Sequence, residues 1–118
     1  MPSFDLTYDF DEDVLEVTFA VFDENFSRSI SLNDHIFLFT DLGLQTVWGI
    51  TFYSYSRLLG VSETDLSGLR ELEQQYSSAI LNLLSTPPAS HFFKVTYPEG
   101  FIARINAPSL QALIENET

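Results

Sequence analysis

The sequence predicts an α+β fold in which an antiparallel β-meander packs against one long helix, followed by a β-hairpin and a short helix. Three patterns lead to this class. Apolar and polar residues alternate over residues 4–21, apolar residues recur at three- and four-residue steps over 62–86, and alternation returns over 91–106. Strands that come in runs, with the helix after them, indicate an antiparallel sheet rather than repeated βαβ units.

The first half of the chain, residues 4–60, is expected to form a four-stranded meander. Residues 4–10 and 15–21 carry large apolar side chains at every second position on either side of the acidic run 11–13. This pattern is typical of a hairpin with one face in the core and one in water. Residues 28–34 then form either a short edge strand or the approach to the next strand.

Two further strands are expected to complete that sheet. Residues 36–39 are apolar at every position, which suits a central strand covered on both faces. Residues 47–55 are rich in aromatic and β-branched side chains, which favour strands. Gly49 lies within this strand and indicates a bulge or the close approach of another backbone.

The second half predicts a helix over 62–86, a hairpin over 91–106 and a short helix over 108–116. Ser62 is a candidate N-cap for the long helix, and Pro87-Pro88 ends it. Pro108 suits the first turn of the last helix. The long helix carries one apolar stripe, formed by Leu66, Leu69, Leu72, Tyr76, Ile80 and Leu83.

Length and composition favour a single domain over residues 1–118. The chain has 118 residues, of which 45% are hydrophobic, so it can build a core unaided. It has no cysteine, which excludes disulfides and thiolate metal sites and fits a reducing compartment. The sequence begins without a signal-peptide pattern, and no stretch approaches the roughly 20 apolar residues of a membrane helix. We therefore expect a complete, soluble, cytoplasmic protein.

The formal net charge is −12, and residues 1–41 contribute most of it, with ten acidic residues against Arg28 alone. Such a charge repels nucleic-acid backbones and anionic membranes, so we expect neither as a partner. Two interpretations remain open. The charge serves solubility, or it forms a docking face for a basic protein.

Residues about 4–60 resemble a short bacterial family catalogued as domain of unknown function 2283. Tyr8-Asp9 is followed by Asp13 and Leu15, Asp41-Leu42-Gly43 stands near the family's turn, and Gly49-Ile50 precedes Ser56-Arg57. The family's usual acid after Gly-Ile is Thr51 here. The resemblance implies a small antiparallel sheet packed with helix, and it implies no activity because the family has none assigned.

Few ionisable residues stand in patterns that carry chemistry. Asp9, Asp11 and Asp13 have the opening spacing of a calcium loop, but the later positions lack its glycine and its acid, so a solvated turn is the expected structure. His35 and His91, each at the start of a predicted strand, are the only histidines and are weak metal candidates. We predict no catalytic residue, no metal site and no cofactor, and therefore no enzyme.

The strand over 47–55 is the best functional hint. Alternation places Trp48, Ile50 and Phe52 on one face of it, and Tyr53 and Tyr55 on the other. Two interpretations of Trp48, Phe52, Tyr53 and Tyr55 remain open. They are ordinary core on both faces of the sheet, or one aromatic face exceeds what a chain of this length covers and is a candidate interaction surface for a second copy or a partner.

The leading hypothesis is an interaction or structural module, homodimeric through an aromatic sheet face or a strand edge. One alternative is a small-molecule-binding domain or enzyme with an aromatic pocket between sheet and helix. Another is an acidic partner that masks a basic protein.

Overall fold

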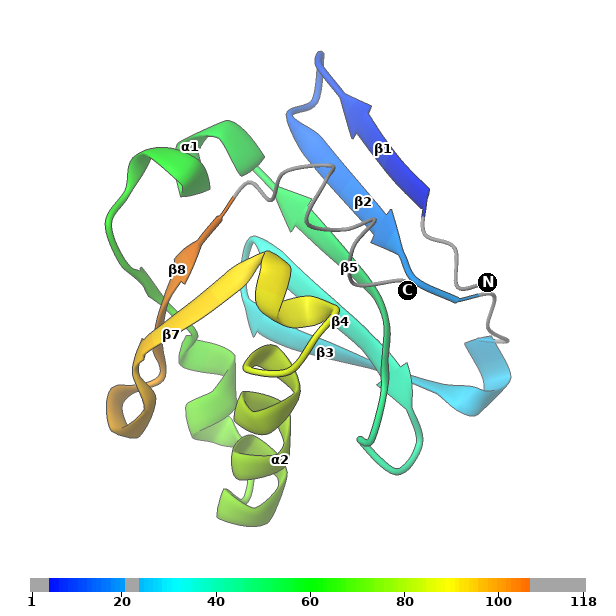
Figure 1. The fold of residues 1–118 in the computed structure, drawn as a ribbon, viewed down its shortest axis with the longest axis vertical. Coiled ribbons are helices and arrows are strands. Elements are labelled where there is room, and N and C mark those ends of the chain that lie inside the picture. Colours follow the sequence, from blue (N-terminus) through cyan, green and yellow to red (C-terminus); the bar gives the residue numbers. More distant parts are fainter. Residues whose placement is uncertain (1–4, 21–23, 107–118) are drawn as a thin grey trace.

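The first half of the chain forms a five-stranded antiparallel sheet (Figure 1). The structure is a computed structural model, and it describes residues 5–20 and 24–106. The strand order is β1-β2-β5-β4-β3. The strands are β1 (Asp5–Asp9), β2 (Val14–Thr18), β3 (Ser27–Asn33), β4 (Ile36–Asp41) and β5 (Val47–Tyr53).

The sheet has one strand more than the four expected, because the segment left open as a strand or an approach is a full edge strand. In β3, Leu32 is buried and Ile30 half-buried, while the serines beside them are exposed. The predicted first hairpin is confirmed, with Asp5 opposite Thr18 and Asp9 opposite Val14. The central strand is β5, which pairs with both β2 and β4 and so joins the two halves of the sheet.

A second, three-stranded sheet has the order β6-β8-β7. Its strands are β6 (Thr64–Asp65), β7 (Phe93–Tyr97) and β8 (Ile102–Ile105). The predicted C-terminal hairpin is confirmed, since β7 pairs with β8 around the short turn η4 (Pro98–Gly100). The pattern gave no sign of β6, whose two residues pair with Ala103 and Ile102.

The expected long helix over 62–86 is wrong. The chain forms α1 (Tyr55–Gly60), then β6, then η2 (Ser67–Glu71) and finally α2 (Gln74–Leu84). Leu66 donates its N–H to the Phe101 carbonyl at 2.8 Å, so it pairs with the second sheet instead of a helical turn. The helix α2 does end three residues before Pro87. The short helix expected over 108–116 lies outside the described residues.

Most residues of the apolar stripe are buried as expected, but they come from a loop and two separate helices. Leu66 precedes η2, Leu69 lies within it, and Ile80 and Leu83 lie on α2. Gly68 marks the point at which η2 approaches β3 closely enough to exclude a side chain. A Cβ at this position would lie 1.9 Å from the Ser31 carbonyl oxygen of β3, so η2 packs directly on the strand backbone.

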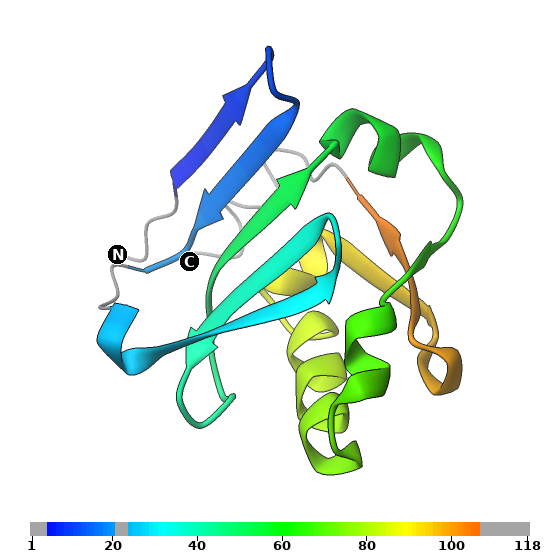
Figure 2. The ribbon, with the colours of Figure 1, turned by 180° about the vertical axis from the view of Figure 1, so that it is seen from behind.

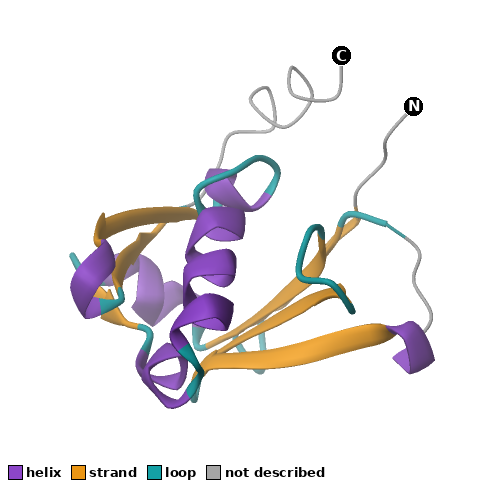
Figure 3. Cartoon of the chain, turned by 90° about the horizontal axis from the view of Figure 1, so that it is seen from below, coloured by secondary structure: helices purple, strands orange, loops and turns teal. Residues whose placement is uncertain are grey.

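The described residues form two layers, and they cover one face of the five-stranded sheet (Figures 2 and 3). The helices and the second sheet lie against the inner face, and side chains from both layers form one hydrophobic cluster. No described helix or strand packs on the outer face. The fully buried members include Leu32, Ile36, Leu38, Ile50 and Phe52 from the first sheet, and Leu66, Leu69, Ile80, Leu84 and Phe92 from the covering layer.

The close contact of η2 with β3 leads to the first prediction. Gly68→Ala should lower the free energy of unfolding by about 1–3 kcal/mol or more, because the added methyl meets backbone that must shift. Gly60→Ala is the matched control, since nothing lies within 4 Å of its Cβ position. That variant should be neutral or slightly stabilising. Urea unfolding followed by Trp48 fluorescence measures both, and equal stability of the two variants would contradict the packing.

Candidate functional site

The acidic run between β1 and β2 forms a hydrogen-bonded turn. The Asp9 carboxylate accepts the N–H of Asp11 at 2.9 Å and of Glu12 at 3.1 Å. Asp13 has a left-handed backbone with φ of 56°, a conformation that Asp tolerates better than most residues. The interpretation of these three aspartates as a turn is confirmed. Over residues 5–20 and 24–106, no three acidic, histidine or cysteine side chains gather as a metal site.

Asp13 also joins this turn to α1, far along the chain. Its carboxylate accepts the Tyr8 hydroxyl at 2.5 Å, the Ser56 hydroxyl at 2.7 Å and the Ser56 N–H at 3.1 Å. Its main-chain oxygen accepts the N–H of Tyr55 at 3.1 Å. Ser54, which precedes α1, makes no side-chain capping bond. Asp13 therefore supplies the acceptor at the start of α1 that Ser54 does not.

The hydrogen bonds at Asp13 shift the pKa values of Asp13 and Tyr8 in opposite directions. The Tyr8 hydroxyl, followed by the Ser56 hydroxyl, holds the pKa of the Asp13 carboxyl below its usual range. The same bond raises the pKa of Tyr8, because the hydroxyl must keep its proton to donate to a carboxylate. Burial raises the pKa of Tyr55. Both shifts at this bond favour the states that it requires, a protonated Tyr8 and an ionised Asp13.

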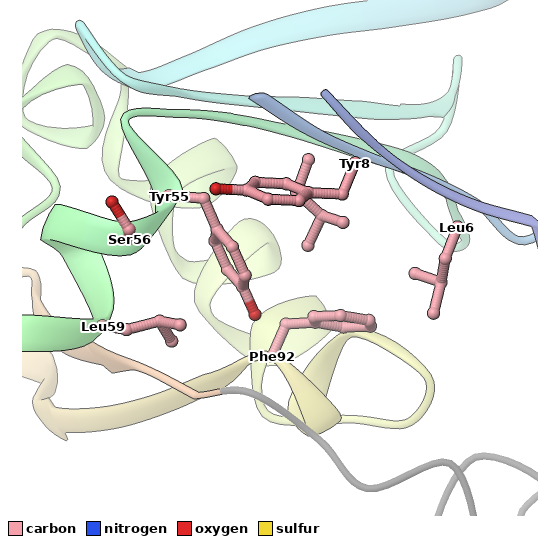
Figure 4. A pocket seen from close by; sticks show the side chains of 7 residues that line it. Leu6, Tyr8, Tyr55, Ser56, Leu59 and Phe92 are labelled. Carbon is pink, nitrogen blue, oxygen red and sulfur yellow. The ribbon is translucent and has the colours of Figure 1, made fainter. Parts of the chain in front are cut away.

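The hairpin and α1 enclose an apolar pocket of about 320 Å³ between the sheet and the second layer (Figure 4). Phe92, beside β7, and Leu15 of β2 are buried within it, whereas Leu6 of β1 is 43% exposed at its side. The lining residues are Leu6, Tyr8, Leu15, Tyr55, Ser56, Leu59 and Phe92. The alternation of β1 predicts that Leu6 and Tyr8 share a face, but no local signal predicts Ser56 or Phe92 beside them.

The three hydroxyl groups that line this pocket all donate hydrogen bonds within the chain. Its hydroxyl groups are already engaged, since Tyr8 and Ser56 donate to Asp13 and Tyr55 donates to the Asn106 carbonyl at 3.3 Å. Neither histidine is among the lining residues. The acceptor beside Tyr8 and Ser56 is the Asp13 carboxylate, whose pKa is lowered.

The two histidines occupy separate turns. His35 lies between β3 and β4, where its N–H reaches the Asn33 side chain at 2.8 Å and its carbonyl accepts the N–H of Tyr53 at 2.7 Å. His91 ends the short helix η3 (Ala89–His91), which precedes β7. His35 is exposed and His91 is half-buried. Neither belongs to a cluster of three metal-ligating side chains in the described part of the chain.

The four aromatic residues predicted as one interaction surface are separated by the fold. Phe52 is fully buried, with its ring 5.5 Å from that of Phe93 and 6.0 Å from that of Phe92. Tyr55 leaves the sheet as the first residue of α1 and lines the pocket. Only Tyr53, 43% exposed, stays on the outer face of the sheet.

Trp48 departs from the expected alternation because it lies in a β-bulge. Phe39 pairs with Gly49 and the next residue, Thr40, pairs with Val47, so Trp48 is the extra residue of β5. The bulge that Gly49 indicated is therefore present. Phe52 and Ile50 still share a face as expected, and that face is the core.

The outer face carries a second candidate site, the outer aromatic patch, defined as Phe37, Phe39, Thr51 and Tyr53. Phe37 and Thr51 are opposite each other on β4 and β5, and the rings of Phe37 and Tyr53 meet edge to face at 5.7 Å. Beside them lies a shallow depression of about 410 Å³, lined by residues that include Glu16, Phe39 and Thr51. No member of the patch is charged, and Glu16 opposite Thr51 lies next to it.

Comparisons with protein-family models, curated proteins and solved structures find no match for this chain. The resemblance to the family of unknown function over residues 4–60 therefore stays a prediction. Among the described residues, no helix has both the length and the apolar character needed to span a membrane.

The bond between Tyr8 and Asp13 leads to a pH prediction. The depressed pKa of Asp13 contributes stability above its ordinary value of about 4, and that contribution is lost as pH falls through the folded pKa. The wild-type chain should therefore exceed Asp13→Asn in unfolding free energy at pH 7, and the difference should shrink by pH 2–3. Asn keeps the shape and the left-handed tolerance of Asp.

A double-mutant cycle with Tyr8→Phe isolates the pair. The coupling between positions 8 and 13 should be measurable by urea unfolding at pH 7 and smaller at pH 2–3. An unchanged coupling at both pH values would mean that the ionised carboxylate does not hold the tyrosine.

Proposed function

We propose that the protein is a non-catalytic interaction module that forms a homodimer through the outer aromatic patch. The observation that carries the proposal is an aromatic surface that no described helix or strand covers, on a chain of net charge −12. Its four members are uncharged, and Glu16 lies opposite Thr51 on the adjoining strand. The lack of cysteine suits work in a reducing compartment, and we propose the cytoplasm.

Charge selects this surface for self-association. Two copies of a strongly acidic chain repel each other, so the surface at which they meet must keep carboxylates apart. The hairpin turn is a poor choice, because Asp9, Asp11 and Glu12 are all exposed there. The strands β3, β4 and β5 present serines, a threonine and aromatic rings instead, including Ser29 and Ser31 beside the patch.

The composition and size of the face suit an interface. Tyrosine and phenylalanine are enriched in interfaces, and buried Tyr is a common source of binding energy. A stable dimer buries roughly 800 Å² per partner. The molecule measures 33 × 32 × 26 Å, so one broad face is wide enough to supply that area. Two sheets packed face to face at about 10 Å would bury the patch against its copy.

The free edges of the sheet are less suitable for pairing. The β1 edge bears Asp5 and Asp9, charges that keep a second strand away. The β3 edge is partly blocked, since η2 packs against the Ser31 carbonyl and Asn33 donates to the Asp65 carbonyl at 3.1 Å. The proposal therefore favours the face over the edge.

The test compares two variants that add the same charge at different places. Tyr53→Asp should raise the dimer dissociation constant at least tenfold, because it places a carboxylate in the interface, and tenfold corresponds to about 1.4 kcal/mol. Phe10→Asp, at a side chain 85% exposed on the hairpin turn, should change it by no more than about threefold. Sedimentation equilibrium measures both constants, and urea unfolding checks that each variant is folded.

A wild-type chain that remains monomeric at every concentration tested would overturn the proposal. Equal weakening by both variants would also count against it, because net charge alone would then explain the effect.

The salt dependence of the dissociation constant distinguishes the homodimer from the alternative, a complex with a basic protein. Screening weakens the repulsion between two acidic copies, so the dimer should tighten between 0.05 and 0.5 M NaCl. A complex between this chain and a basic protein would loosen over the same range. Sedimentation in the two buffers gives the sign directly, and a dimer that loosens with salt would mean that opposite charges meet in its interface.

A further inference from the structure

The apolar pocket beneath the first hairpin has the size and the lining of a site for a small molecule. Its volume of about 320 Å³ is at the lower end of the range for ligand pockets, which are lined mainly by apolar and aromatic side chains. Leu6 lines it and is exposed, and the side chains of Tyr8, Tyr55 and Leu59 are half-buried. Figure 4 shows these side chains pointing toward a common space from β1 and from α1, with Phe92 opposite them. Apolar surface gathered in this way gains free energy when an apolar molecule covers it.

The polar groups at this pocket favour an uncharged ligand. The hydroxyl groups of Tyr8 and Ser56 already donate to Asp13, and that of Tyr55 donates to a main-chain carbonyl, so none has a proton left for an anion. The Asp13 carboxylate lies directly behind two of these hydroxyl groups and repels a second negative charge. A cation would lose its water in a cavity whose seven lining residues include no charged side chain.

The rings around the cavity favour an aromatic ligand. The rings of Tyr8 and Tyr55 lie 6.3 Å apart and meet edge to face, and the ring of Tyr55 lies 5.4 Å from that of Phe52. Phe52 in turn lies 6.0 Å from Phe92, so four rings form a connected set along one side of the pocket. Aromatic rings at such distances attract each other beyond the effect of burial. A planar aromatic molecule would extend this set, whereas a saturated molecule would gain from burial alone.

We propose that this pocket binds a small, uncharged aromatic molecule of one or two rings. The three leucines of the lining contact its edges, and Tyr8, Tyr55 and Phe92 contact it with their rings. Asp13 is a positioning residue, because its bonds to Tyr8 and Ser56 hold the two walls of the cavity at a fixed separation. The inference goes beyond the homodimer, which uses the opposite face of the sheet, so either proposal can fail without the other.

Calorimetric titration of the full chain with indole tests the proposal. Indole should bind saturably, with a dissociation constant of about 1 mM or lower. Indoleacetate and tryptamine add a negative and a positive charge to the same ring system, and both should bind at least tenfold more weakly. Phenol should bind at least threefold more tightly than cyclohexanol, which has the same size and hydroxyl group but no aromatic ring.

A pair of variants on β1 locates the site. Leu6→Trp should weaken indole binding at least tenfold, because the larger side chain occupies the cavity. Thr7→Trp adds the same side chain at the next residue, which points to the other face of the sheet, and should change binding by no more than about twofold. Urea unfolding checks that both variants are folded.

Amide NMR shifts of the wild-type chain locate the site without any substitution. On addition of indole, the largest changes should fall on β1, α1 and Phe92. Changes confined to the outer face of the sheet would overturn the proposal, and so would the absence of saturable indole binding. A charged analogue that binds as tightly as indole, or cyclohexanol that binds as tightly as phenol, would contradict the class of ligand.

Discussion

The five-stranded sheet has two faces, and the described chain supplies a layer for only one of them. The inner face takes α2, η2 and the second sheet, and it contains Ile36, Leu38, Ile50 and Phe52. The outer face keeps Phe37, Phe39 and Tyr53 in a cluster that water partly surrounds. The homodimer proposed above rests on this imbalance, because it would cover the aromatic side chains that the described layers leave half-buried or exposed.

The same shortage of covering chain affects the first hairpin. The β1–β2 hairpin lies at the edge of the sheet and extends beyond the second layer (Figure 1). Polar contacts therefore help to hold it in place. Asp13 does this through Tyr8, Ser56 and the main chain of Tyr55. A carboxylate that accepts three side-chain and main-chain donors fixes the angle between hairpin and α1. The pocket is the space that remains between these two elements.

Local patterns in the sequence predicted the fold where local forces decide it. Alternation found both hairpins, and Pro87-Pro88 lies just after the end of α2. The stripe from Leu66 to Leu83 led to a wrong prediction, because its buried residues come from the loop before η2, from η2 itself and from α2. Tertiary contacts determine the path of the chain here. Gly68 packs on the backbone of β3, and the N–H of Leu66 donates to the Phe101 carbonyl. A pocket between sheet and helix was among the alternatives, but its residues could not be predicted, since contacts such as that of Asp13 with Ser56 join positions 43 residues apart.

The central claim is that the outer face of the sheet meets a second copy of itself. Amide and side-chain NMR shifts recorded during dilution of the unmodified chain test it most directly, because they name the residues that leave the interface. We expect the chemical shifts that change on dilution to belong to residues on the outer face of β3, β4 and β5. The changes at Phe37, Thr51 and Tyr53 should be among the largest. Shifts confined to the hairpin turn or to α2, or spectra that do not change on dilution, would contradict it.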